Sequence, residues 1–181
     1  AFGLPNNLKY ESDGGPGIAR IMELLLGSDN AAEDRNNFFK TQIIFWLLAA
    51  TDGHAKNFSI AHLPGGRYRV TPIYDVLSIH PIIGAGKNQI SPHKAKLAMA
   101  VRGSTNYYLI EKIQRRHWLA QAQQVGLGAA AAEQLIEEVI EATESVIDEV
   151  GNLLPDGFPM DVAEAIFCGM RRQSSRLASF N

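Results

Sequence analysis

Apolar residues in the first third of the chain recur at helical spacing in two places. The first run predicts a helix over residues 18–26, which Gly27 ends, since glycine is common just after a helix. The second run predicts a helix over residues 34–50. Residues 43–48 of this helix are apolar on every side, which is typical of a helix at the centre of a domain.

Two short runs of β-branched and aromatic residues follow, at positions 58–60 and 68–70. Residues 63–67 between them contain Pro-Gly-Gly, which favours a hairpin loop. Thr71 and Pro72 then end the second run. This region therefore predicts one small antiparallel hairpin.

From about Asn106 onward the apolar pattern again has the period of a helix. A long stripe with glutamates on the opposite face predicts the next helix, and residues 153–157 break it. Its members are Leu135, Ile136, Val139, Ile140, Val146, Ile147 and Val150. A last helix carries Val162, Ile166, Phe167 and Met170. We predict a fold that is mainly α with a small β-hairpin, in a single domain over residues 1–181.

The composition is that of an ordinary globular domain, with 46% hydrophobic and 20% charged residues among 181. The net charge of −2 gives no global drive toward nucleic acid or an anionic membrane. No apolar run reaches the ~18 residues of a membrane span, so we expect no membrane partner. The single cysteine, Cys168, excludes an internal disulfide and suits the reducing cytoplasm; we expect it in the core.

The segment with the most chemistry is Thr-Asp-Gly-His-Ala-Lys-Asn at residues 51–57, followed by Tyr74 and Asp75. An Asp, an Asn five residues later and a second Asp beyond a hairpin is the arrangement of a phosphotransferase catalytic loop. In that arrangement Asp52 takes or orients the proton of the substrate hydroxyl. Asn57 and Asp75 would hold Mg²⁺, because the hairpin returns the chain and can bring these two side chains together.

Simpler interpretations exist for several of these residues. An Asp-Gly pair such as Asp52-Gly53 is often only a turn, and a loop lysine such as Lys56 is often only solvated, although it could neutralise phosphate charge. His54 could either bond the loop backbone or contact a nucleotide. The five histidines show no metal-ligand spacing, so we do not expect a histidine metal site.

Two further patterns favour plain structural roles. The glycine-rich residues 13–17 lack the preceding strand and the following lysine of a phosphate loop, which favours a turn that caps a helix. Two basic clusters could bind nucleic acid, but solvated helix faces are the favoured interpretation. They are Lys112, Arg115, Arg116 and His117, and Arg171, Arg172 and Arg176.

The combined motifs resemble the HipA family of toxin kinases. The matching segments are residues 49–59, Ala-Ala-Thr-Asp-Gly-His-Ala-Lys-Asn-Phe-Ser, and residues 65–76, Gly-Gly-Arg-Tyr-Arg-Val-Thr-Pro-Ile-Tyr-Asp-Val. Shorter matches are residues 9–11, 13–17, 96–99 and 116–120, so the resemblance covers nearly the whole chain. It implies the helical C-terminal lobe of a protein-kinase-like (HipA/PI3-4-kinase-like) fold.

The resemblance also implies a function for each matching residue. Asp52 corresponds to the catalytic aspartate, and Asn57 and Asp75 to the magnesium ligands. The nucleotide-binding residues implied by it are His54, Ala55, Lys56, Asn57, Tyr74 and Asp75. The implied cofactors are ATP and Mg²⁺, and the implied reaction is phosphorylation of a protein serine or threonine.

Partners are implied in the same way. HipA-like kinases bind a HipB-like antitoxin, and the complex sits on operator DNA; the best-known member phosphorylates glutamyl-tRNA synthetase, which halts translation and promotes persistence. Gln123 and Gln124 stand where the family has basic residues, which argues against direct DNA contact by this helix.

One departure from the family concerns the N-terminal lobe. A complete HipA-like kinase has a glycine-rich phosphate loop and a strand lysine that contacts the nucleotide, and neither is found in this sequence, which begins with Ala1. We therefore expect a fragment that has little activity alone. The alternatives are a kinase-like small-molecule phosphotransferase and an antitoxin- or DNA-docking module without catalysis.

Overall fold

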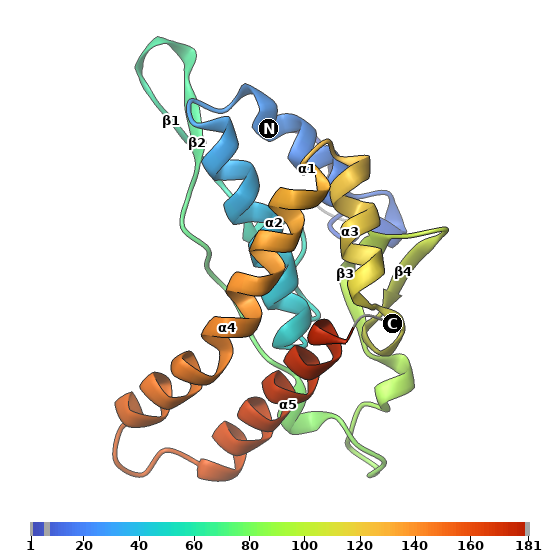
Figure 1. The fold of residues 1–181 in the computed structure, drawn as a ribbon, viewed down its shortest axis with the longest axis vertical. Helices are drawn as coiled ribbons and strands as arrows, with labels where there is room; N and C mark the ends of the chain where they lie inside the picture. The colour runs from blue at the N-terminus through green and yellow to red at the C-terminus, as the bar shows by residue number, and fades with distance from the viewer. Residues whose placement is uncertain (1, 6–7, 180–181) are drawn as a thin grey trace.

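The computed structural model describes residues 2–5 and 8–179. In this part of the chain five α-helices pack against one another, and two small antiparallel hairpins lie beside them (Figure 1). The helices are α1 (Ile18–Leu24), α2 (Ala31–Leu47), α3 (Arg115–Gln124), α4 (Ala129–Leu153) and α5 (Met160–Ala178). The strands are β1 (Ile60–His62), β2 (Tyr68–Val70), β3 (Lys96–Arg102) and β4 (Asn106–Leu109). The predicted fold class, mainly helical with little strand, is confirmed.

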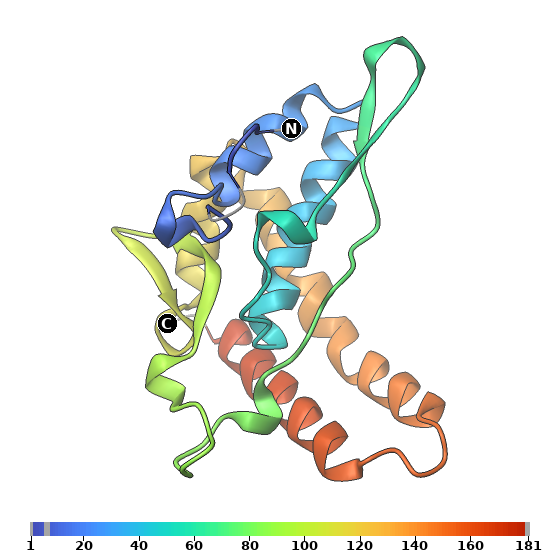
Figure 2. The same cartoon turned by 180° about the vertical axis from the view of Figure 1, so that it is seen from behind.

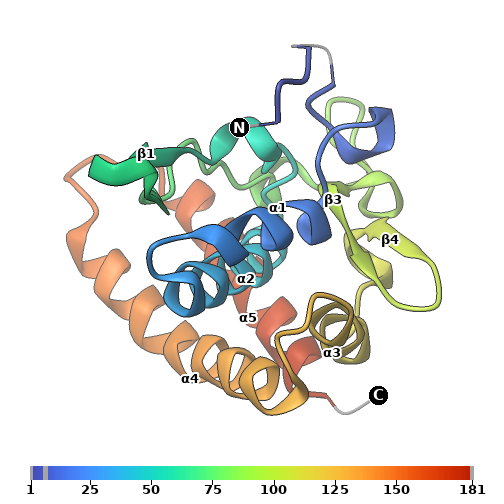
Figure 3. The same ribbon diagram turned by 90° about the horizontal axis from the view of Figure 1, so that it is seen from above.

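Helix α2 forms the centre of the molecule, as its apolar sequence predicted. Seen from above, it lies inside a ring formed by the other helices and β3 (Figure 3). Its side chains Phe39, Ile43 and Trp46 are completely buried. The indole N–H of Trp46 donates to the carbonyl of Ile110 at 3.0 Å, so the one polar atom of this buried ring is satisfied.

The ends of α2 differ from the prediction by three residues each, since the helix spans 31–47 rather than 34–50. It ends early because Ala49 adopts a left-handed backbone conformation with φ of 50°. The amide of Ala50 then donates to the carbonyl of Phe45 at 2.8 Å, which closes the helix end. Helix α1 likewise gives way at Leu25 to a 3₁₀ turn that ends at Gly27.

The first hairpin was predicted, with a small error in its start. Strand β1 begins two residues later than expected, and Ile60 pairs with Val70 while His62 pairs with Tyr68. Phe58, expected in the strand, instead packs against the ring of Phe38 with 4.9 Å between centroids. The hairpin projects from the top of the molecule in Figure 1.

The second hairpin was missed, and the prediction of helix from Asn106 is wrong for residues 106–109. Positions 107, 110 and 113 have helical spacing, but Tyr107 lies in β4 and Ile110 begins a 3₁₀ turn. Strand β3 is buried at every position from Leu97 to Val101. A short run that is apolar on both faces has no alternation by which sequence can identify a strand.

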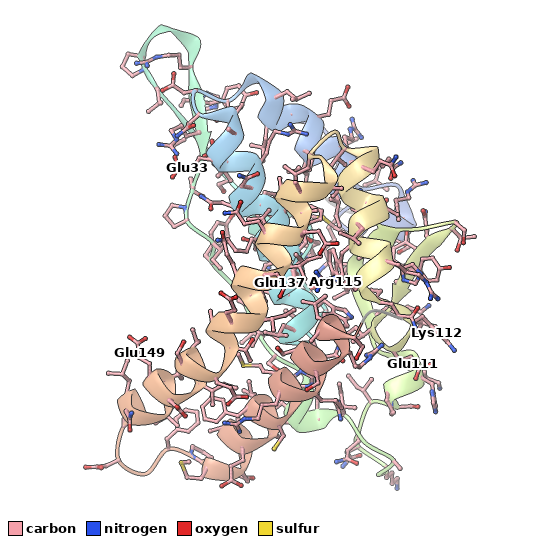
Figure 4. All side chains as sticks on the ribbon, in the orientation of Figure 1. Glu33, Glu111, Lys112, Arg115, Glu137 and Glu149 are labelled. Atoms are coloured by element: carbon pink, nitrogen blue, oxygen red, sulfur yellow. The ribbon has the colours of Figure 1, made fainter. Side chains whose placement is uncertain are left out.

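The basic cluster of Lys112, Arg115, Arg116 and His117, at and just before the start of α3, is only partly a solvated face. Arg116 and Lys112 are exposed, but Arg115 and His117 are buried. Arg115 forms ion pairs with Glu133 and Glu137 of α4, and Figure 4 shows Arg115 and Glu137 side by side. Burial of a guanidinium requires such partners. This arginine therefore joins α3 to α4.

The basic cluster on α5 also has structural partners. Arg171 pairs with Glu144 of α4 at 2.9 Å, and Arg176 donates to the carbonyls of Glu111 and Ile113. The guanidinium of Arg176 lies 5.4 Å from the centre of the Trp46 ring. Of this cluster, Arg171 and Arg172 are exposed, whereas Arg176 is half-buried.

Two smaller expectations about the C-terminal helices are wrong. Cys168 is exposed rather than in the core, because Gly169 and Met170 take the buried face of α5. Val146 and Val150 of the apolar stripe are also exposed, since α4 extends past the body at this end (Figure 1).

Among the described residues no helix is long and apolar enough to cross a membrane.

A buried carboxylate fixes the first hairpin to α2. Asp34 accepts hydrogen bonds from the amide of Val70 at 3.0 Å, from the Arg69 guanidinium at 3.2 Å and from the Ser28 hydroxyl. Burial raises the pKa of Asp34, but the hydrogen bonds from Ser28, Val70 and Arg69 outweigh it, so the pKa lies below its ordinary 3.8.

We expect Asp34→Asn to lower the free energy of unfolding by about 1–3 kcal/mol at pH 7, because an amide cannot accept all of these bonds. A carboxylate whose folded pKa is depressed stabilises the fold above its unfolded pKa and loses this effect as pH falls through the folded pKa. The difference in free energy of unfolding between the wild type and Asp34→Asn should therefore shrink below about pH 4. Urea unfolding of the wild type and the variant at pH 7 and pH 3 measures this difference. The control is Asp29→Asn, which removes the carboxylate of an exposed ion pair with Arg67. An equal loss of free energy of unfolding in Asp34→Asn at both pH values would contradict this account.

Candidate functional site

The phosphotransferase-like loop begins where α2 ends. After the left-handed Ala49 the chain leaves the helix, and the amide of His54 donates to the carbonyl of Asp52 at 2.8 Å. A 3₁₀ turn over Ala55–Asn57 follows, in which the amide of Asn57 donates to the carbonyl of His54 at 2.9 Å. Asp52 and Asn57 thus lie at the two ends of one compact loop.

Gly53 allows this loop to lie directly on α2. A Cβ at this position would come within 2.2 Å of the ring of Phe45, which is shorter than any tolerated contact. The backbone of Gly53 is buried. Gly53 is therefore packed on the core, so this turn is more than a solvated one.

Asn57 and Asp75 lie side by side, as the hairpin between them predicted. The side-chain amide of Asn57 donates to both the backbone carbonyl and the carboxylate of Asp75, each at 3.1 Å. Asn57 is 2% exposed, whereas Asp75 is exposed and has a left-handed φ of 57°. A non-glycine residue in this conformation is uncommon and aims its carboxylate beside the amide.

The segment that carries Asp75 is attached to the same end of α2. Figure 2 shows it running from the hairpin down along the helix. The amide of Ile79 donates to the carbonyl of Ala49 at 3.3 Å, and the ring of His80 bonds the carbonyl of Leu47 at 2.9 Å. Burial lowers the pKa of His80, with the nearby Arg172 acting in the same direction against the bond to Leu47.

Asn57 and Asp75 have the side-chain types that hold a magnesium ion whose other ligands are substrate phosphates and water. In this structure Nδ2 of Asn57 faces Asp75, so the Asn57 amide would turn its Oδ1 toward the ion. Mg²⁺ is typically bound by one or two carboxylates together with phosphate oxygens. The contact at 3.1 Å brings both side chains to one place. Within residues 2–5 and 8–179 no three histidine, cysteine or carboxylate side chains converge to hold a metal by themselves.

Asp52 is 54% exposed and is surrounded by donors. The hydroxyl of Tyr10 donates to its Oδ1 at 2.5 Å, and Lys9 Nζ and His54 Nε2 each lie 3.6 Å from the same oxygen. The hydrogen bond from Tyr10, aided by His54 and Lys9, lowers the pKa of Asp52 despite partial burial. Asp52 is therefore ionised at neutral pH.

The His54 ring contacts the side chains of Asp52 and Tyr10 rather than the loop backbone. Its ring is buried, with Nε2 toward Asp52 and its edge against the Tyr10 ring at 5.4 Å between centroids. Its Nδ1 has no hydrogen-bond partner within the described part of the chain. The His54 ring thus lies between Tyr10 and Asp52.

Tyr74 connects the two halves of the site. Its hydroxyl donates to the carbonyl of Lys56 at 2.9 Å and lies 2.7 Å from the Ser59 hydroxyl. Lys56 is exposed at the rim, and Ala55 is half-buried beside it. All the predicted site residues thus come from two segments that meet at the end of α2.

Sequence reasoning missed Tyr10 and Lys9 as members of the site. Tyr10 is 42 positions from Asp52, and no local spacing connects the two. In the sequence, residues 9–11 match the HipA family, but this match implied no function for Lys9 or Tyr10.

Comparison with known proteins identifies a family, and its matches include a curated relative and a solved structure. The family model described as "HipA-like C-terminal domain" matches residues 1–147. A Sinorhizobium fredii (strain NBRC 101917 / NGR234) protein named "Putative kinase Y4mE" is 27% identical over 151 residues, which is 83% of this chain and 33% of that protein. A chain of the Shewanella oneidensis MR-1 toxin–antitoxin complex of HipA, HipB and operator DNA has a TM-score of 0.80 at 19% identity, over 98% of this chain and 42% of that one. The chain thus spans less than half the length of both relatives.

We expect Gly53→Ala to lower the free energy of unfolding by about 1–3 kcal/mol, because the added methyl group overlaps the Phe45 ring. Thermal or urea unfolding measures the change. Gly151→Ala on the exposed end of α4 is the matched control, since its Cβ would be no closer than 3.9 Å to another residue. That control should be neutral or stabilising by about 0.5–1 kcal/mol. Equal effects of the two substitutions would show that Gly53 is not needed for close packing.

Proposed function

The chain belongs to the HipA-like C-terminal domain family, and from this we propose that it is the catalytic lobe of a serine/threonine protein kinase that uses ATP and Mg²⁺. The observation that carries the proposal is the pairing of Asn57 with Asp75 beside the loop of Asp52. These side chains have the types, the order and the proximity that phosphoryl transfer requires.

Each residue is proposed for one task. Asp52 orients the substrate hydroxyl and accepts its proton, while Asn57 and Asp75 hold the metal. Bound Mg²⁺ would neutralise the phosphate charge and align the transferred phosphoryl group. His54, Ala55, Lys56 and Tyr74 form the loop and the rim against which the nucleotide is proposed to lie, and the lysine adds positive charge.

We propose that residues 1–181 form one domain, the C-terminal lobe of a longer kinase. The support is that the chain covers 33% and 42% of its two longer relatives. A nucleotide held by this lobe alone lacks the covering glycine-rich loop and the strand lysine of the family. We therefore expect the isolated chain to be inactive or nearly so.

The proposed partners follow from the family and from the Shewanella complex of HipA with HipB and operator DNA. For this chain we propose a HipB-like antitoxin, with operator DNA reached through the antitoxin, and glutamyl-tRNA synthetase as the first substrate to test. Arg115 and Arg171 each pair with glutamates of α4, which supports an indirect rather than a direct contact with DNA.

The first experiment is transfer of radiolabelled phosphate from Mg-ATP to glutamyl-tRNA synthetase by the full-length protein that contains this chain. Asp52→Ala should lower the rate about 10²–10⁴-fold, because the group that accepts the proton is lost. The isolated chain should give little transfer.

Each other result has a distinct meaning. Transfer by the isolated chain that Asp52→Ala abolishes would show that this lobe is sufficient. No transfer by the full-length protein would favour another substrate, including a small molecule, if ATP is still hydrolysed. Antitoxin binding without nucleotide binding would favour the docking function.

We expect Asp75→Asn to weaken Mg²⁺-dependent nucleotide binding at least about tenfold, since an amide is a poorer ligand than a carboxylate for a hard cation. Calorimetric titration of the full-length protein with a non-hydrolysable ATP analogue, with and without Mg²⁺, measures this. Asp148→Asn on the exposed face of α4 should change nothing. If Asp75→Asn binds nucleotide as well as the wild type with Mg²⁺ present, Asp75 is not the metal ligand.

A further inference from the structure

Three donors converge on a single oxygen of Asp52. The Tyr10 hydroxyl is at 2.5 Å from Oδ1, and Lys9 Nζ and His54 Nε2 are both at 3.6 Å from this same atom. Of the two oxygens, Oδ1 is the one that accepts the hydrogen bond of Tyr10. The carboxylate is thus held asymmetrically, with one oxygen bound to the protein.

The residue that makes the shortest contact is itself held tightly. The backbone carbonyl of Tyr10 accepts the amides of Asp13 at 3.1 Å and Gly15 at 2.9 Å. Gly14 closes this turn with a left-handed φ of 95°. A Cβ on Gly15 would lie 2.7 Å from the carbonyl oxygens of both Leu8 and Tyr10, so the turn requires glycine there.

The neighbouring residue, Glu11, anchors the same turn to the body of the protein. Its carboxylate accepts the amide of Ala100 in β3 at 2.6 Å. Gly17, at the start of α1, lets the carboxylate approach, since a Cβ there would lie 2.3 Å from it. Burial raises the pKa of Glu11 against the bond from Ala100. The turn that carries Tyr10 is therefore anchored to β3 through Glu11.

We propose that Tyr10 is a positioning residue for phosphoryl transfer, and that the turn of residues 9–17 holds it on Asp52. By occupying Oδ1, the Tyr10 hydroxyl directs Oδ2 of Asp52 toward the substrate hydroxyl. This inference rests on the proposed kinase function. It also gives a role to the glycine-rich segment that the sequence excluded as a phosphate loop.

The phosphoryl transfer that Tyr10 would support needs no reactant besides ATP and the substrate hydroxyl. The O–H bond of the substrate serine or threonine breaks, and its proton goes to Oδ2 of Asp52. The oxygen forms a bond to the γ-phosphorus of ATP, and the bond from that phosphorus to the bridging oxygen breaks, leaving ADP with the electron pair. Tyr10 keeps its own proton throughout.

A purely structural contact would also explain the hydrogen bond, so the test must separate the two roles. Tyr10→Phe removes the hydroxyl and keeps the ring against His54. The matched control is Tyr107→Phe, whose hydroxyl lies 3.2 Å from Ser104 on the second hairpin and touches no residue of the site. Both variants are made in the full-length protein.

We expect Tyr10→Phe to lower kcat about tenfold with the KM for ATP unchanged, and Tyr107→Phe to leave both unchanged. The second measurement is the pKa of Asp52 from the carbon-13 shift of its carboxyl group, assigned by comparison with Asp52→Asn. A donor to the ionised form lowers a pKa, so its removal in Tyr10→Phe should raise the pKa of Asp52 toward 3.8. The melting temperature of each variant reports whether the fold is kept.

The outcomes separate this inference from the proposed function. An unchanged kcat in Tyr10→Phe, beside an inactive Asp52→Asn, would overturn the inference alone. A lower kcat with an unchanged pKa of Asp52 and a lower melting temperature would reduce Tyr10 to a structural contact. Retained activity in Asp52→Asn would overturn the proposed function, whereas the carboxyl titration would still decide whether Tyr10 holds Asp52.

Discussion

The burial of the C-terminal half of α2 is the constraint on which the site depends. Because Trp46 and its neighbours are enclosed on every side, the C-terminal end of this helix is a fixed point. The loop of Asp52 starts there, and the segment of Asp75 returns there through Ile79 and His80. Two segments attached to one rigid end can hold Asn57 and Asp75 at 3.1 Å although eighteen residues separate them. The packing of the core thus determines how Asn57 and Asp75 lie relative to each other.

The two aspartates of the site have different surroundings, which suits different tasks. Asp52 is met by a phenol, an ammonium group and an imidazole, so its charge is balanced by the protein and one of its oxygens is fixed. The carboxylate of Asp75 meets the neutral amide of Asn57, so its charge is left for a cation. Such a difference in environment agrees with the two tasks proposed for them, proton transfer for Asp52 and metal binding for Asp75.

Sequence predicted the parts of the fold that have a local signal. The spacing from Asp52 to Asn57 and the hairpin before Asp75 were sufficient to predict the meeting of Asn57 with Asp75. The second hairpin could not be predicted, because β3 is buried on both faces and shows no alternation. The pairing of Arg115 with α4 depends on how two helices pack, and the contact of Tyr10 with Asp52 joins residues far apart in the sequence. No local pattern encodes either contact.

The glycines of residues 13–17 show how one composition can serve two kinds of site. A phosphate loop uses glycine so that a ligand can approach the backbone. Here Gly15 lets the carbonyls of Leu8 and Tyr10 approach, and Gly17 lets the carboxylate of Glu11 approach. In both cases the missing side chain leaves room for polar atoms, and only the identity of those atoms differs. The requirement for glycine therefore indicates close approach to the backbone, and in this fold its consequence is the placement of Tyr10 on the oxygen of Asp52.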